Sequence, residues 1–95
     1  MILIRSDAAL ADVDEIWLFI ARDSEREADR LLGRIDGAYR RLLDFPKMGV
    51  ERTDLAAGIR AVRLENYVIY YRLEPDAVSI ERVLHTRRDA TAIAF

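Results

Sequence analysis

Cysteine is absent from the sequence, and the 95 residues include only one histidine, one tryptophan, two prolines and four glycines. Without cysteine there is no disulfide framework and no thiolate chemistry, which is more typical of a small domain in a reducing compartment than of a secreted one. One histidine leaves only carboxylates as metal ligands, and no acidic spacing resembles a calcium loop. We therefore expect a cytoplasmic protein with no metal site and no cofactor.

Long apolar runs and nucleotide-binding loops are absent too. The start of the chain, MILIRSD, reaches Arg5 after too few apolar residues for a signal-peptide core, and no later run approaches membrane-spanning length. The glycines form neither a GxGxxG nor a Walker pattern. A net charge of −2 argues against a general nucleic-acid binder. We expect no membrane association and no sequence-specific DNA binding by this chain.

Arginine is the abundant polar feature: of 15 basic residues, all but Lys47 are arginine. Arginine suits bidentate contacts with carboxylates and phosphates, although a high-GC coding sequence would produce the same bias. With 52% hydrophobic and 34% charged residues, the composition is that of an ordinary globular chain. The length corresponds to a single domain over residues 1–95.

The first half of the chain predicts a strand and two helices. Residues 2–5, ILIR, read as a short strand, and Ser6 or Asp7 can cap the helix that follows and ends near Arg22. A capping box at Ser24 and Glu27 starts a second helix, which Pro46 ends. Helical spacing predicts these buried positions: Leu10, Val13, Ile16, Trp17 and Ile20 in the first helix; Ala28, Leu31, Leu32, Ile35, Ala38, Tyr39, Leu42 and Leu43 in the second.

The second half predicts three consecutive strands after a turn-rich connection, PKMGVERTDLAAG. The stretch IRAVRLENYVIYYRLEPDAVSIERVLH is rich in β-branched and aromatic residues, with turn signals at residues 65–66 and 75–76. Such short links make an antiparallel meander, which the first strand can join at an edge. The tail predicts a short helix capped by Asp89. We expect an α+β fold, β-α-α-β-β-β, with a helical hairpin packed on a small, mainly antiparallel sheet.

Arginines near the end of the chain form the candidate site. If the last strand is regular, Arg82 and His85 lie near Arg60 and Arg63 of its sheet partners, with Arg87 and Arg88 beyond the strand end. Such a group could stabilise a phosphodiester transition state while His85 moves a proton. It could equally be a protein-docking patch, and a docking or structural role is the commoner one for arginines at the rim of a sheet.

Two features indicate a partner. Leu18 and Phe19 fall off the apolar stripe of the first helix and should be exposed. Gly33 and Gly37 lie four apart on the polar face of the second helix, where each glycine costs about 1 kcal/mol relative to alanine. A missing side chain there would let another backbone approach closely. The alternative is that all four are tolerated surface residues.

Four segments together resemble a known family. DVDEIWLFIA in the first helix, FPKMG after the second, GIRAVRLENYVIYYRL in the hairpin and IERVLHTRRD at the end are similar to the RelE/ParE superfamily of bacterial toxins, most closely to its ParE branch. The resemblance covers nearly the whole chain. It implies the same β-α-α-β-β-β fold and the toxic half of a type II toxin–antitoxin module. It also implies neutralisation by an antitoxin segment, for which Leu18, Phe19, Gly33 and Gly37 are our candidate contacts.

The branches of this superfamily imply different targets. ParE-like members inhibit DNA gyrase by binding and have no known catalytic residues, which makes Arg82, His85, Arg87 and Arg88 a candidate docking surface. RelE-like members cleave messenger RNA on the ribosome, for which Arg60, Arg63, Arg82 and His85 would be the counterparts. The scarcity of lysine and the ending TAIAF, which offers no tyrosine, favour the ParE branch and a protein that is not an enzyme. A third possibility is a non-toxic relative that only binds an antitoxin.

Overall fold

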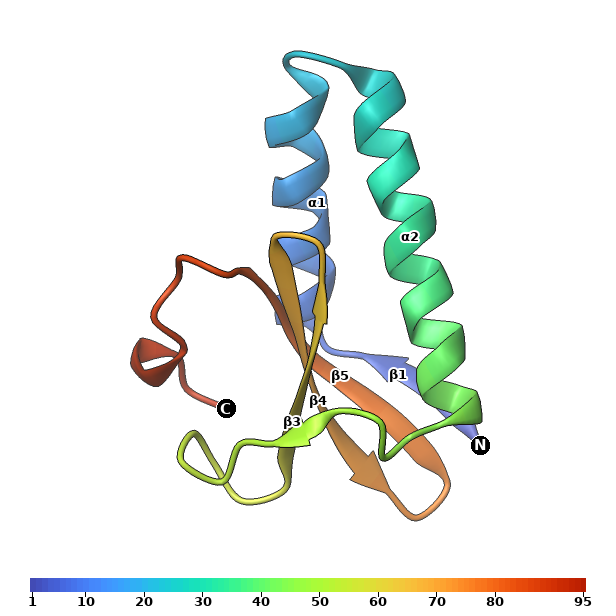
Figure 1. Ribbon diagram of the computed structural model, residues 1–95, viewed down its shortest axis with the longest axis vertical. Coiled ribbons are helices and arrows are strands. Elements are labelled where there is room, and N and C mark those ends of the chain that lie inside the picture. Colours follow the sequence, from blue (N-terminus) through green and yellow to red (C-terminus); the bar gives the residue numbers. More distant parts are fainter.

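The computed structural model describes residues 1–95, in which two helices lie on one face of a five-stranded sheet (Figure 1). The elements are β1 (Ile2–Arg5), α1 (Asp7–Ala21), α2 (Glu25–Asp44), β2 (Val50–Glu51), β3 (Ile59–Leu64), β4 (Tyr67–Glu74), β5 (Ala77–His85) and a 3-10 helix, η1 (Ala90–Ala92). The predicted α+β class is confirmed. Neither helix combines the length and the apolar character needed to span a bilayer.

The strands lie side by side in the order β1-β5-β4-β3-β2. β3, β4 and β5 form the predicted antiparallel meander. β1 pairs in parallel with β5, with Ile2 opposite Ala77 and Arg5 opposite Ile80. The first and last strands of the chain are therefore neighbours, and the sheet is mixed.

One strand was not expected from the sequence. The connection between α2 and β3 is not made of turns alone, because Val50 and Glu51 form β2 and pair with Ala61 and Arg60 of β3. A strand of two residues is too short to show the alternation by which strands are recognised. β2 extends the sheet and brings the connecting segment against β3.

Glycine is required at position 49, just before β2, because the backbone there passes close to the side chain of Tyr71. Its N–H donates to the hydroxyl of Tyr71 at 2.9 Å, and that hydroxyl donates to the carbonyl of Pro46 at 2.7 Å. A Cβ at position 49 would lie 2.5 Å from Tyr71 Oη and 3.0 Å from the carbonyl oxygen of Ala61. The segment after α2 is thus anchored to a buried tyrosine of β4.

Ser6 caps α1 and also attaches it to the sheet. Its hydroxyl accepts from the N–H of Ala9 at 3.0 Å and donates to the carbonyl of Glu81 at 2.7 Å. The predicted cap is confirmed, and the second bond fixes the start of α1 against β5.

The capping box predicted for α2 forms only in part. Ser24 Oγ accepts from the N–H of Glu27 at 3.1 Å, as expected. The return bond is missing, because the N–H of Ser24 donates to the carbonyl of Ile20 and the Glu27 carboxylate accepts from Arg30 instead. The last turn of α1 therefore takes the N–H that the capping box would have used.

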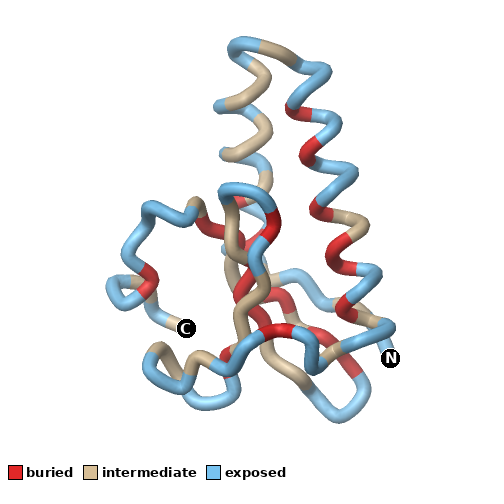
Figure 2. Tube along the Cα trace, in the orientation of Figure 1, coloured by how far each residue is buried: buried red, intermediate tan, exposed pale blue.

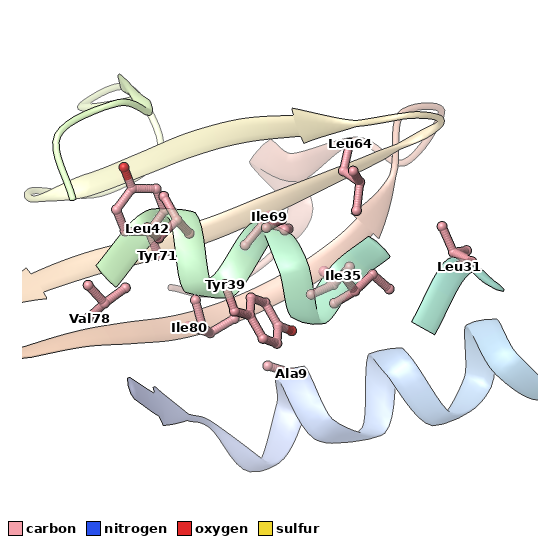
Figure 3. Close-up of a cluster of buried hydrophobic side chains, with 12 residues drawn as sticks. Ala9, Leu31, Ile35, Tyr39, Leu42, Leu64, Ile69, Tyr71, Val78 and Ile80 are labelled. Carbon is pink, nitrogen blue, oxygen red and sulfur yellow. The ribbon is translucent and has the colours of Figure 1, made fainter. Parts of the chain in front are cut away.

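The core lies between the helices and the sheet (Figures 2 and 3). Its buried residues are Ala9, Leu31, Ile35, Ala38, Tyr39, Leu42, Leu64, Ile69, Tyr71, Val78, Ile80 and Val83. A second, smaller cluster lies on the opposite face, because Ile69 and Tyr70 are consecutive on β4 and belong to different clusters. The segment after β5 packs on this second cluster through Ala90 and Phe95.

The buried stripe of α1 differs from the predicted one. Leu10 is exposed, whereas Ala9 and Asp12 are the buried residues of this helix. The stripe is therefore displaced by one position at its start, and small Ala9 lets α1 lie close to the core (Figure 3). Leu32 of α2, also predicted to be buried, is exposed at the surface between the helices.

Candidate functional site

Leu18 and Phe19 on α1 are exposed, with 61% and 68% of their surfaces accessible to solvent. The prediction that they lie outside the core is confirmed. α1 runs away from the sheet toward the loop that joins it to α2 (Figure 1), so the sheet covers less of its last turns. Consecutive helix positions point about 100° apart, and the two side chains consequently border different depressions.

Phe19 borders a hollow of about 250 Å³ between α1 and the end of β5. This α1–β5 hollow is lined by Asp12, Glu15, Ile16, Phe19, Tyr67, Val83, Leu84, His85 and Arg88. Its volume is below the roughly 300–1,000 Å³ of small-molecule sites, so it suits one side chain of a partner better than a cofactor. No group of three or more histidine or carboxylate side chains is placed to hold a metal ion.

His85 is oriented within this hollow by two contacts. Its ring meets Tyr67 edge to face, with the ring centroids 5.4 Å apart. Its Nδ1 accepts from the backbone N–H of Arg87 at 3.1 Å. In the neutral ring the proton therefore resides on Nε2, which makes His85 a hydrogen-bond donor at that nitrogen.

Leu18 borders a groove between the two helices. This α1–α2 groove is lined by Val13, Asp14, Trp17, Leu18, Asp29 and Leu32. Trp17 Nε1 donates to Asp29 Oδ1 at 2.9 Å and ties the helices together across it. Asp29, Gly33 and Gly37 follow one another at intervals of four along α2, and an added Cβ at either glycine would meet no atom within 4 Å. Open space therefore continues along α2 from the groove.

Arg82 belongs to an ion pair between the sheet and α1. Its Nε and Nη2 donate to the carboxylate of Asp12 at 2.7 and 2.8 Å, and the N–H of Val83 donates to the same carboxylate at 2.9 Å. The side chains of Arg82 and Asp12 are 20% and 7% exposed. The hydrogen bonds to Asp12 raise the pKa of Arg82. Its guanidinium is thus engaged inside the protein.

Arg60 and Arg63 do not join Arg82 and His85 in one cluster. β4 lies between β3 and β5, so the two pairs of residues are not on adjacent strands. Arg60 binds Glu51 at 3.0 Å and the carbonyl of Gly49 at 2.8 Å, while Arg63 Nε donates to the carbonyl of Glu65 at 2.8 Å. The expectation that Arg60 and Arg63 lie beside the β5 residues is wrong, because β4 separates the two strands and each arginine binds an acceptor of its own.

Arg87 and Arg88 lie in the turn after β5 and are exposed. The N–H of Arg88 donates to the carbonyl of His85 at 2.9 Å, which fixes this turn. Neither guanidinium takes part in any of the ion pairs of the protein. The free cationic groups next to the α1–β5 hollow are therefore these two.

Sequence reasoning missed Asp12, Glu15 and Tyr67 as residues of this region. Asp12 carried a signal, because an acidic residue at the inward spacing of an apolar stripe needs a buried cation or donors as its partner. Glu15 carried none, since its place in the hollow depends on how α1 crosses the end of the sheet. Tyr67 lies opposite His85 in the β4–β5 pairing, and that register depends on an irregularity between Tyr70 and Tyr71 that the sequence does not mark.

Comparisons with known proteins agree with this structure. The family described as ParE toxin of type II toxin-antitoxin system, parDE, matches residues 3–90. Toxin ParE3 of Caulobacter vibrioides is 30% identical over 91 residues, which cover 95% of this chain and 91% of the relative. A solved structure, the chromosomal ParDE TA system from P. aeruginosa, has the same fold, with a TM-score of 0.75 and 22% identity over 90% of this chain and 95% of that one. The chain therefore belongs to the ParE family, the toxins of type II toxin–antitoxin systems.

Proposed function

We propose that this toxin inhibits DNA gyrase by binding to it and has no catalytic activity of its own. The observation that carries the proposal is the pairing of Arg82 with Asp12. A ribonuclease site needs cations that are free and converge on the phosphodiester. Here Arg60, Arg63 and Arg82 each bind a separate acceptor within the protein, which supports a binding mechanism.

The proposed target-docking surface consists of His85, Arg87 and Arg88. We omit Arg82 from it because two of its nitrogens are bound to Asp12. The exposed guanidiniums of Arg87 and Arg88 have no acidic partner in the toxin, and His85 offers Nε2–H beside them. Such a surface suits an acidic patch on the target protein.

The antitoxin is the second partner, and we propose that it covers Leu18 and Phe19. An amphipathic antitoxin helix along α1 would place apolar side chains in the α1–α2 groove, as in helix-in-groove recognition. Gly33 and Gly37 would let a second antitoxin segment approach the backbone of α2. In this proposal the whole chain acts as one toxin domain in the cytoplasm, needs no cofactor, and leaves promoter DNA binding to the antitoxin.

A supercoiling assay with purified gyrase tests the target. Folded toxin at stoichiometric excess should reduce supercoiling and trap cleaved DNA, and antitoxin should relieve both effects. The double variant Arg87→Glu/Arg88→Glu should lose inhibition while keeping the fold. Wild-type toxin without effect on supercoiling would contradict the gyrase proposal.

One observation favours a second candidate, messenger RNA cleavage on the ribosome. His85, with a proton on Nε2, lies in the same hollow as Arg88, so a hydrogen-bond donor and a cation are close together. Ribosome-dependent cleavage that disappears in His85→Ala would establish this alternative. A toxin that binds antitoxin but causes no growth arrest would instead be a harmless relative.

A further inference from the structure

A further apolar surface lies at the turn after α2, apart from the surface on α1. Phe45 and Met48 in this turn are 67% and 45% exposed. They border a shallow depression of about 540 Å³. Its lining, which we call the corner patch, consists of Asp44, Phe45, Pro46, Lys47 and Met48. Neighbouring apolar side chains left in water on a small protein commonly mark an interaction surface.

The backbone of the corner patch is fixed by hydrogen bonds. The N–H of Met48 donates to the carbonyl of Phe45 at 3.1 Å and closes the turn. The hydroxyl of Tyr71, a buried residue of β4, donates to the carbonyl of Pro46 at 2.7 Å. Phe45 and Met48 therefore extend from a backbone that is already in place, so a partner that covers them meets a small cost in conformational entropy.

The charges of the corner patch match those of a second copy of the same patch. Asp44 and Lys47 carry opposite charges, and neither takes part in any ion pair of the protein. In a twofold arrangement each contact between two different residues is made twice, so Lys47 of either copy can meet Asp44 of the other. A partner surface of one sign would match one of these charges and oppose the other.

We infer that the corner patch is a self-association surface, through which the toxin forms a twofold dimer with a second copy of this chain. Phe45 of each copy packs on Pro46 and Met48 of the other, and two ion pairs between Lys47 and Asp44 flank this contact. The apolar side chains cover less than the roughly 800 Å² per partner of a standard interface, so we expect a weak dimer with a dissociation constant of roughly 10–100 μM.

This surface is distant from the proposed antitoxin contacts. α2 has 20 residues, so about 30 Å of helix separates the corner patch from the loop next to Leu18 and Phe19 (Figure 1). The inference is also independent of the gyrase proposal, because association is measured on the toxin alone. A toxin that leaves supercoiling unchanged could still form the dimer.

Sedimentation velocity of the purified toxin, from about 1 to 500 μM, tests for the dimer by its dependence on concentration. Phe45→Ala should weaken association at least about 10-fold. Asp44→Lys and Lys47→Glu should each weaken it about 5-fold, because each variant brings like charges together twice. The double variant Asp44→Lys/Lys47→Glu should restore association, since opposite charges meet again. Urea denaturation checks folding, and a cation at position 44 suits the carboxyl end of α2.

Two matched controls should change association by no more than about twofold. Phe19→Ala removes an aromatic ring of equal exposure, and Arg22→Glu reverses an exposed charge at the other end of the helical hairpin. A toxin that sediments as a monomer over the whole range would overturn the inference, as would a double charge variant that associates no better than the single ones. A monomeric toxin whose Phe45→Ala variant binds antitoxin more weakly would assign the corner patch to the antitoxin instead.

Discussion

The guanidinium of Arg82 and the carboxylate of Asp12 form a two-bond ion pair, with distances of 2.7 and 2.8 Å, that joins β5 to α1. This pair orients one wall of the α1–β5 hollow, because Asp12 lies one turn before Ile16. It also removes Arg82 from the set of cations available to a target.

Breaking this pair should destabilise the fold. Asp12→Ala leaves Arg82 without its partner in a half-buried position and leaves the N–H of Val83 without its acceptor. We expect a loss of about 3–5 kcal/mol in the free energy of unfolding. Urea denaturation measures it. The double variant Asp12→Leu/Arg82→Met should recover part of the loss, since no uncompensated charge remains; equal stability of wild type and Asp12→Ala would contradict the structural role.

Replacing tyrosine by phenylalanine should have opposite effects on stability at two tyrosines of the core. Tyr39 is 3% exposed and its hydroxyl has no hydrogen-bond partner, and burial raises its pKa to about 12. Tyr39→Phe removes an unsatisfied polar atom and should raise stability by about 1 kcal/mol. Tyr71→Phe removes the acceptor of Gly49 N–H and should lower stability by about 1–3 kcal/mol. Thermal denaturation of both variants decides the signs, and a loss at Tyr39 would show that its hydroxyl has a partner.

Alanine substitutions at the three glycines of α2 and the loop after it should change the stability of the toxin in opposite directions. Gly33→Ala and Gly37→Ala should each stabilise the free toxin by roughly 0.5–1 kcal/mol, because the new methyl group enters open space in a helix. Gly49→Ala should destabilise it, since its Cβ would lie 2.5 Å from Tyr71 Oη. Denaturant unfolding gives all three values.

Affinity for the antitoxin provides a second readout for the helix glycines. If an antitoxin backbone packs on α2, the two alanine variants that stabilise the free toxin should bind the antitoxin more weakly. Unchanged affinity would assign Gly33 and Gly37 to tolerated surface positions and remove them from the antitoxin surface.

Phe19 and Phe45 offer a matched comparison, with 68% and 67% of their surfaces exposed. Phe19→Ala should lower antitoxin affinity at least about 10-fold, which corresponds to about 1.4 kcal/mol, because an exposed aromatic at the centre of an interface is a typical hot spot. Phe45→Ala should leave it unchanged. Both should change stability by no more than about 0.5 kcal/mol. Leu18→Ala is expected to follow Phe19→Ala, and equal effects at residues 19 and 45 would argue against α1 as the contact.

Acid should remove one specific contribution to stability. Arg30 donates to both carboxylate oxygens of Glu65 at 3.0 and 3.1 Å, which lowers the pKa of Glu65 from its usual 4.5. Because the folded-state pKa is depressed, the contribution is complete above about pH 4.5 and is lost as the pH falls through the lowered value. The difference in urea midpoint between wild type and Glu65→Gln should therefore shrink below pH 4.5. A difference that stays constant from pH 7 to pH 3 would contradict the role of this pair.

The helices and the meander could be predicted because their signals are local. Ser6 and Ser24 cap the helices, Pro46 follows the second one, and the turns at residues 65–66 and 75–76 separate the strands. β2 was missed because two residues carry no periodicity. Leu10 was misplaced because the stripe of this helix was drawn from its large apolar residues, which omits Ala9 and Asp12, the positions that are buried.

The candidate site was less predictable because it depends on tertiary placement. The exposure of Leu18 and Phe19 follows from the helical wheel of α1 alone. The separation of Arg60 and Arg63 from His85 requires the strand order, which places β4 between them. The meeting of Phe19 with His85 requires the crossing of α1 over β5, for which no residue pattern exists. A prediction made without the strand order therefore placed Arg60 and Arg63 next to His85, although the fold keeps them apart.

The parallel pairing of β1 with β5 sets the order in which the binding surfaces are completed during synthesis. Ser6 and its acceptor at Glu81 are 75 residues apart, so the ribosome must make most of the chain before the first strand finds its partner. The α1–α2 groove is built from consecutive helices, and its parts are present early, whereas the α1–β5 hollow is completed only when residues 83–88 have left the ribosome. Non-local contacts of this kind form late in folding. In the proposed scheme, the residues of the groove that would take the antitoxin are therefore synthesised before the surface that would reach the target is complete.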